Sequence, residues 1–204
     1  MGMKQILVMI AAVVLGQSVL ADEKLIADPI VEKAVRKKLK KPEGELTEAD
    51  LGKVTRLDLH FTQITDTGLK EVAKLQKLTW LRLDNTQITD EGLKDLAMLQ
   101  KLRKLDLIAT KITDEGLKDL AMLQNLTRLN LYSTKITDAG LKEVAKLQQL
   151  EWLNLSGTKI NGTGLMDLAK LKKLKYLFLI VTEVTKAGAA ELKKALPNCT
   201  ILGL

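Results

Sequence analysis

The residues of this chain best suited to recognition chemistry are its aromatic side chains and its single histidine, and all of them fall in one narrow phase of a repeat. The chain is only 3% aromatic. Large aromatic rings at solvent-facing sites are typical anchors for a bound partner. The residues in question are His60, Phe61, Trp80, Tyr132, Trp152, Tyr176 and Phe178.

Enzyme chemistry has little support in the same residues. His60 and Asp58 lie two residues apart, but no serine or cysteine nucleophile is identifiable beside them. The sequence has no glycine-rich phosphate loop after a strand and no His/Cys cluster for zinc. We therefore predict no enzyme activity, no catalytic residue, no cofactor and no metal site.

The spacing of the aromatic residues follows a 24-residue repeat. Within a copy, Leu81 and Leu83 lie two apart, which predicts a short strand with one buried face, whereas Leu93, Leu96 and Leu99 follow helical spacing. Each copy is therefore a strand, a turn and a helix, and stacked copies would bury a continuous core. The copies start at Val54, Leu78, Leu102, Leu126, Leu150 and Leu174.

Polar residues recur at fixed points of each copy and have structural explanations. A threonine at each strand exit, from Thr62 to Thr182, can satisfy backbone groups of the turn. Thr-Asp pairs such as Thr89-Asp90 begin the helices of the first four copies, where the carboxylate favours the positive end of the helix dipole. We expect the glycine two residues later to allow a close approach of helix and strand. The aspartates belong to separate layers, so we do not interpret them as metal ligands.

The pattern Leu-x-x-Leu-x-Leu-x-x-Thr-x-Ile-Thr-Asp-x-Gly-Leu resembles the leucine-rich repeat family. It is most similar to the cysteine-containing subfamily familiar from F-box proteins and to secreted bacterial proteins with such repeats. Threonine stands where that subfamily usually has cysteine, which suits an oxidising compartment. The resemblance implies an α/β solenoid, with a curved parallel sheet on the concave side, helices on the convex side, and binding of other macromolecules on the concave sheet.

Strand side chains alternate, so the third, fifth and seventh positions of each copy are expected on the concave face, with the eighth at the rim. Copies one to four mix both charges there, and copies five and six are mainly aromatic and uncharged. Such a face suits a protein or peptide with a charged and a hydrophobic segment. The predicted partner-binding residues are Arg56, Asp58, His60, Phe61, Trp80, Arg82, Asp84, Lys104, Asp106, Arg128, Asn130, Tyr132, Trp152, Asn154, Tyr176 and Phe178.

Two other functions remain open for the same residues. Sugars stack on aromatic rings and bond to polar side chains, so a glycan groove could form from Trp80, Asp84, Trp152, Asn154 and Tyr176. A purely structural role is the third possibility. Nucleic-acid binding ranks below both, because acidic residues interleave with the basic ones and would repel a phosphate backbone.

The first 21 residues have the pattern of a targeting signal. Residues 1–21 have the form of a signal peptide, with Lys4, an apolar stretch over 6–15 and small residues up to Ala21. The alternative is an uncleaved anchor. Cleavage would leave an exported chain, periplasmic or secreted, with no transmembrane helix.

The next segment, residues 22–53, predicts a helical N-terminal cap. Asp28 and Pro29 have the pattern of a helix start, and the helix should run to Leu39. Its basic residues predict a solvated helix face, with contact to an anionic surface as the alternative. They are Lys33, Arg36, Lys37, Lys38, Lys40 and Lys41.

The repeats occupy residues 54–204 and comprise six full copies and a C-terminal capping strand. The last copy is stretched by one residue. Its spacing predicts Cys199 as a buried thiol and places Leu202 and Leu204 at core positions of the final strand.

Overall fold

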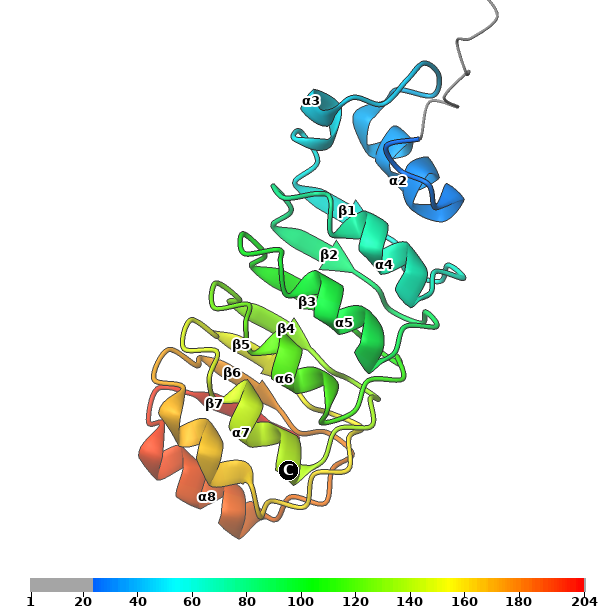
Figure 1. Ribbon diagram of the computed structural model, residues 1–204. Coiled ribbons are helices and arrows are strands. Elements are labelled where there is room, and N and C mark those ends of the chain that lie inside the picture. The colour runs from blue at the N-terminus through cyan, green and yellow to red at the C-terminus, as the bar shows by residue number, and fades with distance from the viewer. Residues whose placement is uncertain (1–23, 204) are drawn as a thin grey trace, which may run out of the picture.

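The computed structural model describes residues 24–203, and the predicted signal peptide lies outside them. Seven short parallel strands form one sheet in chain order, and helices cover one side of it (Figure 1). Equivalent residues of adjacent copies pair, as Leu57 does with Leu81. The strands are β1 (Arg56–Asp58), β2 (Trp80–Arg82), β3 (Lys104–Asp106), β4 (Arg128–Asn130), β5 (Trp152–Asn154), β6 (Tyr176–Phe178) and β7 (Thr200–Leu202).

The helices shorten along the stack and lengthen again at its end. Copy five has Asn161-Gly162 where earlier copies have Thr-Asp, and its helix is of the 3-10 type. Thr89 caps its helix by accepting from the Glu91 amide, and Thr113 and Thr137 bond in the same way, whereas Thr65 makes no such bond. The elements are α4 (Asp66–Val72), α5 (Asp90–Leu96), α6 (Gly116–Leu120), η1 (Asp138–Gly140), α7 (Leu141–Val144), η2 (Leu165–Lys170) and α8 (Lys186–Ala195).

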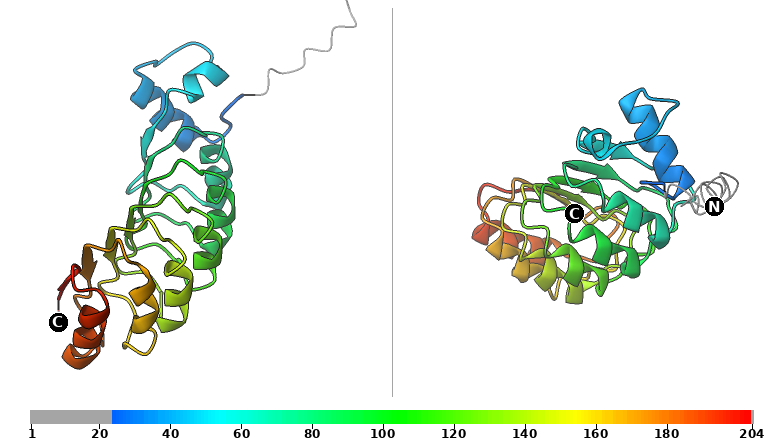
Figure 2. Two further views of the ribbon diagram at one scale, coloured as in Figure 1. Left: turned by 90° about the vertical axis from the view of Figure 1, so that its left-hand side faces the viewer. Right: turned by 45° about the horizontal axis from the view of Figure 1, so that its top comes forward.

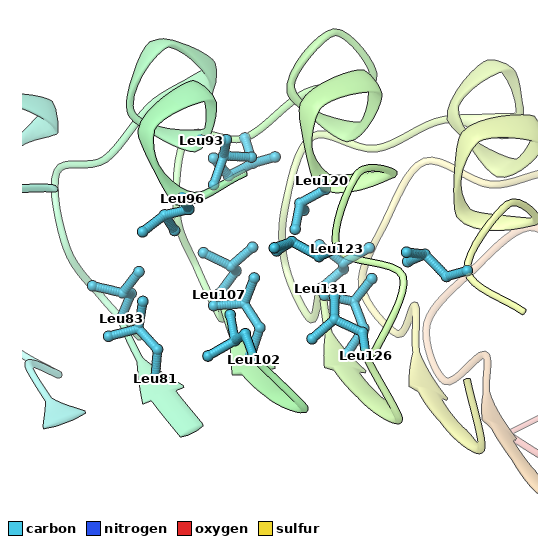
Figure 3. Close-up of a cluster of buried hydrophobic side chains, with 14 of the residues drawn as sticks. Leu81, Leu83, Leu93, Leu96, Leu102, Leu107, Leu120, Leu123, Leu126 and Leu131 are labelled. Atoms are coloured by element: carbon cyan, nitrogen blue, oxygen red, sulfur yellow. The ribbon is translucent and has the colours of Figure 1, made fainter. Parts of the chain in front are cut away.

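Leucine layers fill the space between strands and helices (Figure 3). Leu81 and Leu83 from the strand and Leu93 and Leu96 from the helix are fully buried, and their equivalents repeat this in each copy. Each strand-exit threonine donates from Oγ1 to the carbonyl three residues earlier, at 2.5 to 2.7 Å. The predicted role of these threonines is confirmed.

Asp66 and Asp90 lie in the first turn of their helices, and the helix-start aspartates also bond to the next copy, which the sequence did not predict. Asp66 accepts from the backbone N–H and the Oγ1 of Thr89, at 2.9 and 2.7 Å. Asp90 and Asp114 bond in the same way to Thr113 and Thr137. These carboxylates therefore join adjacent copies.

Three of the recurring glycines face these aspartates, where a close approach of helix and strand was expected, and this corrects that prediction. A Cβ on Gly92 would lie 2.5 Å from Asp66 Oδ1, and a Cβ on Gly116 would collide with Asp90. Gly188 follows a copy without the aspartate, and a Cβ there meets only Thr185 Oγ1, at 3.5 Å. Gly92, Gly116 and Gly140 therefore make room for the carboxylate of the preceding copy.

The predicted helix before the repeats is confirmed as α2 (Pro29–Leu39), with Asp28 accepting from the amides of Ile30 and Val31. Val31 and Val35 are both buried against the core. A short helix, α3 (Glu48–Leu51), follows and leads into β1. No helix among residues 24–203 is long and apolar enough to cross a membrane.

The final strand pairs in a different register from the predicted one. Ile201 lies opposite Leu177, so it takes the core position assigned to Leu202, which is exposed. The extra residue is absorbed between Cys199 and the strand: the Cys199 amide donates to the Leu196 carbonyl as that of Leu174 does to Leu171, yet Thr200 pairs with Tyr176. Cys199 is buried and free, as predicted. Leu204 lies outside the described residues.

Candidate partner-binding surface

The predicted partner-binding residues lie along the concave side of the sheet and its rim, at three different depths. Asp84, Asp106 and Asn130 are buried. His60, Trp80, Arg82, Arg128, Trp152, Asn154 and Phe178 are half-buried. The exposed members are Arg56, Asp58, Phe61, Lys104, Tyr132 and Tyr176.

Two buried acidic residues, Asp84 just after β2 and Asp106 in β3, lie at the floor of the concave face beside arginines. Asp84 Oδ2 accepts from Arg82 Nε at 2.6 Å, and Asp84 Oδ1 accepts from the amide of Ile108 at 3.4 Å. Asp106 lies 3.7 Å from Arg128 Nε, and burial raises its pKa above the usual value. The expected mixed-charge surface is therefore corrected: over these strands the basic groups are outermost.

A groove of about 530 Å³ lies over β2 to β4 and is lined by these side chains. Its lining contains five basic side chains against only two acidic ones, Asp84 and Asp106. A net positive groove of this kind favours an acidic ligand segment. The basic side chains are Arg56, Arg82, Arg103, Lys104 and Arg128.

Each tryptophan is stacked by an arginine from the preceding copy. The Arg56 guanidinium carbon lies 4.8 Å from the Trp80 ring centroid, and that of Arg128 lies 3.5 Å from Trp152. Phe178 packs against Trp152, with ring centroids 5.0 Å apart. The sequence signal for these cation–π pairs is an arginine one repeat before a tryptophan. The sequence predicts these residues on the concave face but does not predict that they stack on one another.

Apolar side chains are exposed along the same face from the turn after β4 to β7, most of them at its C-terminal end. Exposure is 48% for Tyr176, 49% for Ile180 and 79% for Val181, and Leu202 and Tyr132 are also exposed. We call these five residues the apolar patch. The predicted set does not include Ile180, Val181 and Leu202. The first two occupy the seventh and eighth repeat positions but are not aromatic, and the repeat spacing predicts Leu202 in the core.

The eighth position of each copy lies in a tight turn beyond the strand. Its backbone is left-handed in every copy, including φ of 54° at Phe61 and 55° at Val181. Glycine, which tolerates this conformation, is present only in copy five, as Gly157. The turn holds Phe61 and Val181 out from the rim at opposite ends of the stack.

His60 and Asp58 form a pair beside β1. His60 Nδ1 lies 2.6 Å from Asp58 Oδ1, and Asp58 Oδ2 lies 3.8 Å from Arg82. Within the described part of the chain, His60 has no hydrogen bond to a hydroxyl or thiol side chain. The pair is a polar contact on the surface and lacks the geometry of an activated nucleophile.

Comparison with known proteins agrees with this architecture. A family model described as leucine-rich repeat matches residues 53–73, 74–97, 99–121, 123–145 and 147–169. No curated protein matches the chain. The solved structure of internalin C2 from Listeria monocytogenes is similar, with a TM-score of 0.67 and 28% identity over 87% of this chain and 84% of that one.

Two further solved structures share the fold. A leucine-rich repeat protein of Leptospira interrogans has a TM-score of 0.62 and 28% identity over 75% of this chain. A second internalin of Listeria monocytogenes has a TM-score of 0.63 and 23% identity over 87% of this chain. The matched regions span 38% and 56% of those two proteins. With the family model matching more than half of its length, the chain belongs to the leucine-rich repeat family.

Proposed function

We propose that the protein is a non-catalytic binding module that recognises an extended segment of a partner protein on its concave sheet. The observation that carries this proposal is the apolar patch, which lies on the same face as the basic groove. Exposed apolar residues that gather in one place on a soluble protein typically mark an interaction site. Leucine-rich repeat proteins mostly use this face for that purpose.

The apolar patch would supply most of the binding free energy. Tyr176 presents a large, rigid ring, and Ile180 and Val181 extend its apolar area toward the rim. Beneath them, Phe178 and Trp152 pack against each other and support the surface. Burial of one or two such aromatic anchors typically contributes about 2 kcal/mol or more each.

The basic groove would set the orientation of the bound segment. Arg82 and Arg128 are held close to Asp84 and Asp106, so they are ordered before binding. Preorganised charges favour the complementary sequence more than they raise affinity. We therefore infer a partner segment with acidic residues at one end and apolar residues at the other.

The tryptophan geometry argues against the glycan alternative. Sugar recognition needs an open ring face, but Arg128 covers one face of Trp152 at 3.5 Å and Phe178 packs against the ring. Trp80 is likewise covered by Arg56. The same covering disfavours single-stranded nucleic acid, which stacks its bases on free aromatic faces.

The place of action is proposed from the amino-terminal sequence. Residues 1–21 have the features of a signal peptide, and removal near Ala21 would place the binding module in the periplasm or the medium. N-terminal sequencing of the protein secreted by an expressing bacterium would test this, with a new amino terminus at Asp22 as the expected result.

Peptide selection tests the binding proposal. A displayed library of random 12-residue peptides is selected on residues 22–204, and the Kd of the enriched peptides is measured by fluorescence anisotropy. Tyr176→Ala and Trp152→Ala should each weaken binding about tenfold or more, which corresponds to about 1.4 kcal/mol. Unchanged affinity in both variants would exclude the concave site.

The matched controls are Met98→Ala and Met122→Ala, which remove exposed apolar side chains from the loops after α5 and α6. These variants should bind the peptides as the wild type does. Glycan-array binding that is lost in Trp80→Ala would instead support the carbohydrate reading, and enrichment of no peptide would favour a structural role.

A further inference from the structure

A second groove lies at the opposite end of the stack, between α2 and β1. Figure 1 shows α2 beyond β1, at the end of the sheet, and the views in Figure 2 place it far from α8. The groove has a volume of about 1010 Å³, at the upper end of the roughly 300–1,000 Å³ that is typical of ligand clefts. One wall is α2, and the other is the β1 segment from Arg56 to Gln63.

The β1 wall is the open edge of the sheet. Leu59 and Phe61 donate their amides to the carbonyls of Arg82 and Asp84 in the next copy. Successive residues of a strand direct their backbone N–H and C=O groups to opposite sides. Because those of Leu59 and Phe61 face the next copy, the N–H and C=O groups of Arg56 and Asp58 point away from β2. An edge of this kind is a template for another strand. In every later copy the equivalent carbonyls already have a strand partner, as Arg82 has Leu59.

The α2 wall combines apolar and basic side chains on one helical face. Ile30 and Ala34 are half-buried there, and Lys33, Lys37 and Lys38 are exposed and line the groove. These three lysines take part in no ion pair within residues 24–203. Other basic residues of this segment serve the cap itself: Arg36 pairs with Glu32, and Lys41 pairs with Asp50.

We propose that an extended, acidic peptide segment of a partner protein binds in this groove as an additional strand on the edge of β1. Its backbone would bond to the open N–H and C=O groups of Arg56 and Asp58. Its acidic side chains would meet Lys33 and Lys37, and its apolar side chains would pack on Ile30 and Ala34. Backbone ladders provide affinity in such complexes, and the flanking side chains provide specificity.

The positive charge of the groove favours an acidic partner, because stabilisation of the helix dipole does not account for all of it. Lysines in the last turn of a helix stabilise the helix itself, which can account for Lys37 and Lys38. Lys33 lies one turn earlier, outside that range, yet it lines the groove with them. Arg56 adds a fourth positive charge from β1, against the single carboxylate of Asp58, which is engaged by His60.

The probe is a fluorescein-labelled peptide of eight residues with alternating glutamate and valine. We expect measurable anisotropy on titration with the protein, and at least tenfold weaker binding to the variant Lys33→Gln/Lys37→Gln. Lys70→Gln/Lys142→Gln removes the same charge from the convex helices α4 and α7 and should bind as the wild type does. Equal affinity of the two double variants would overturn the proposal.

Strand addition is tested separately from charge. Asp58→Pro removes an outward N–H and should abolish binding, whereas Asp58→Ala should retain it; circular dichroism checks that both variants fold. A peptide N-methylated at alternate amides should not bind. Binding of the N-methylated peptide would contradict the proposal. Binding of phosphatidylserine vesicles without binding of the probe would also contradict it and would indicate that the groove binds anionic surfaces in general.

This site is independent of the concave proposal. Tyr176 lies at the other end of the sheet, so Tyr176→Ala should leave the affinity for the acidic probe unchanged. Loss of probe binding in that variant would show that the probe occupies the concave face, which would also overturn the edge site.

Discussion

Polar side chains on the concave face act in two ways, according to their depth. Asp84 is buried and bonds to Arg82 and to the next copy, so it stabilises the sheet. Lys104 and Tyr176 are exposed and available to a ligand. Both kinds of residue occupy the concave-face positions of the repeat, so repeat position alone does not distinguish structural residues from residues available to a ligand.

Burial determines the reactivity of the single cysteine. Cys199 is fully buried, and desolvation raises the pKa of its thiol above the usual value. The folded protein should therefore fail to react with Ellman's reagent at neutral pH, whereas the protein unfolded in guanidinium should release one equivalent of chromophore. Rapid reaction of the native protein would show that the last strand opens readily.

Val181 combines exposure with backbone strain. A β-branched residue at a φ of 55° is unfavourable, so Val181→Gly should raise the free energy of unfolding by about 1 kcal/mol. Denaturant unfolding measures the change. The reciprocal variant Gly157→Val should destabilise, because a Cβ there lies 2.9 Å from Ser133 Oγ. If Val181 belongs to the binding surface, Val181→Gly should also weaken peptide binding, so that a more stable variant binds less well.

Contacts between successive copies depend on the glycine and aspartate positions of the helices. A Cβ on Gly164 would collide with the backbone carbonyl oxygen of Asp138, which cannot move as a side chain can. Gly164→Ala should therefore lower the free energy of unfolding by about 1–3 kcal/mol. Gly188→Ala has room in α8 and should instead stabilise by about 0.5–1 kcal/mol. Equal effects in denaturant titrations would contradict this explanation of the repeat.

The cap contains an acid-sensitive contact in α3. Hydrogen bonds from Lys41, Lys53 and Thr47 hold the pKa of Asp50 well below its usual value of 3.8. The stabilisation is therefore present above pH 3.8 and is lost as the pH falls through the lower folded-state pKa. Asp50→Asn should have a lower Tm than the wild type at pH 7, and the difference should narrow below pH 3.8. A constant difference across this range would exclude the charge as its cause.

Most elements could be predicted from the sequence because their signals are local. Asp28-Pro29 begins α2, and leucines two apart mark each strand. The register of β7 could not be predicted, because the spacing of the stretched last copy does not show where its extra residue is absorbed, and Ile201 rather than Leu202 pairs with Leu177. The burial of Asp84 and Asp106 and the stacking of Arg128 on Trp152 depend on side chains one copy away. These contacts follow from curvature and side-chain length, which repeat spacing does not specify.

At the scale of the whole molecule, the stack offers three different surfaces. The concave face is basic over β2 to β4 and apolar near β6, and the edge of β1 is an open strand beside a basic helix. At the opposite end, α8 covers the last copy through Ala189 and Leu192. A partner that spans the concave face would therefore bind with a defined direction along the sheet.

Photo-crosslinking locates the bound partner most directly. Benzoylphenylalanine is placed at Tyr176 or, as the control, at Met122 beyond α6, and each protein is irradiated with a selected peptide. We predict crosslinking from position 176, at apolar residues of the peptide, and none from position 122. Crosslinking from position 122 with none from position 176 would show that the partner binds outside the concave face and would contradict the proposed function.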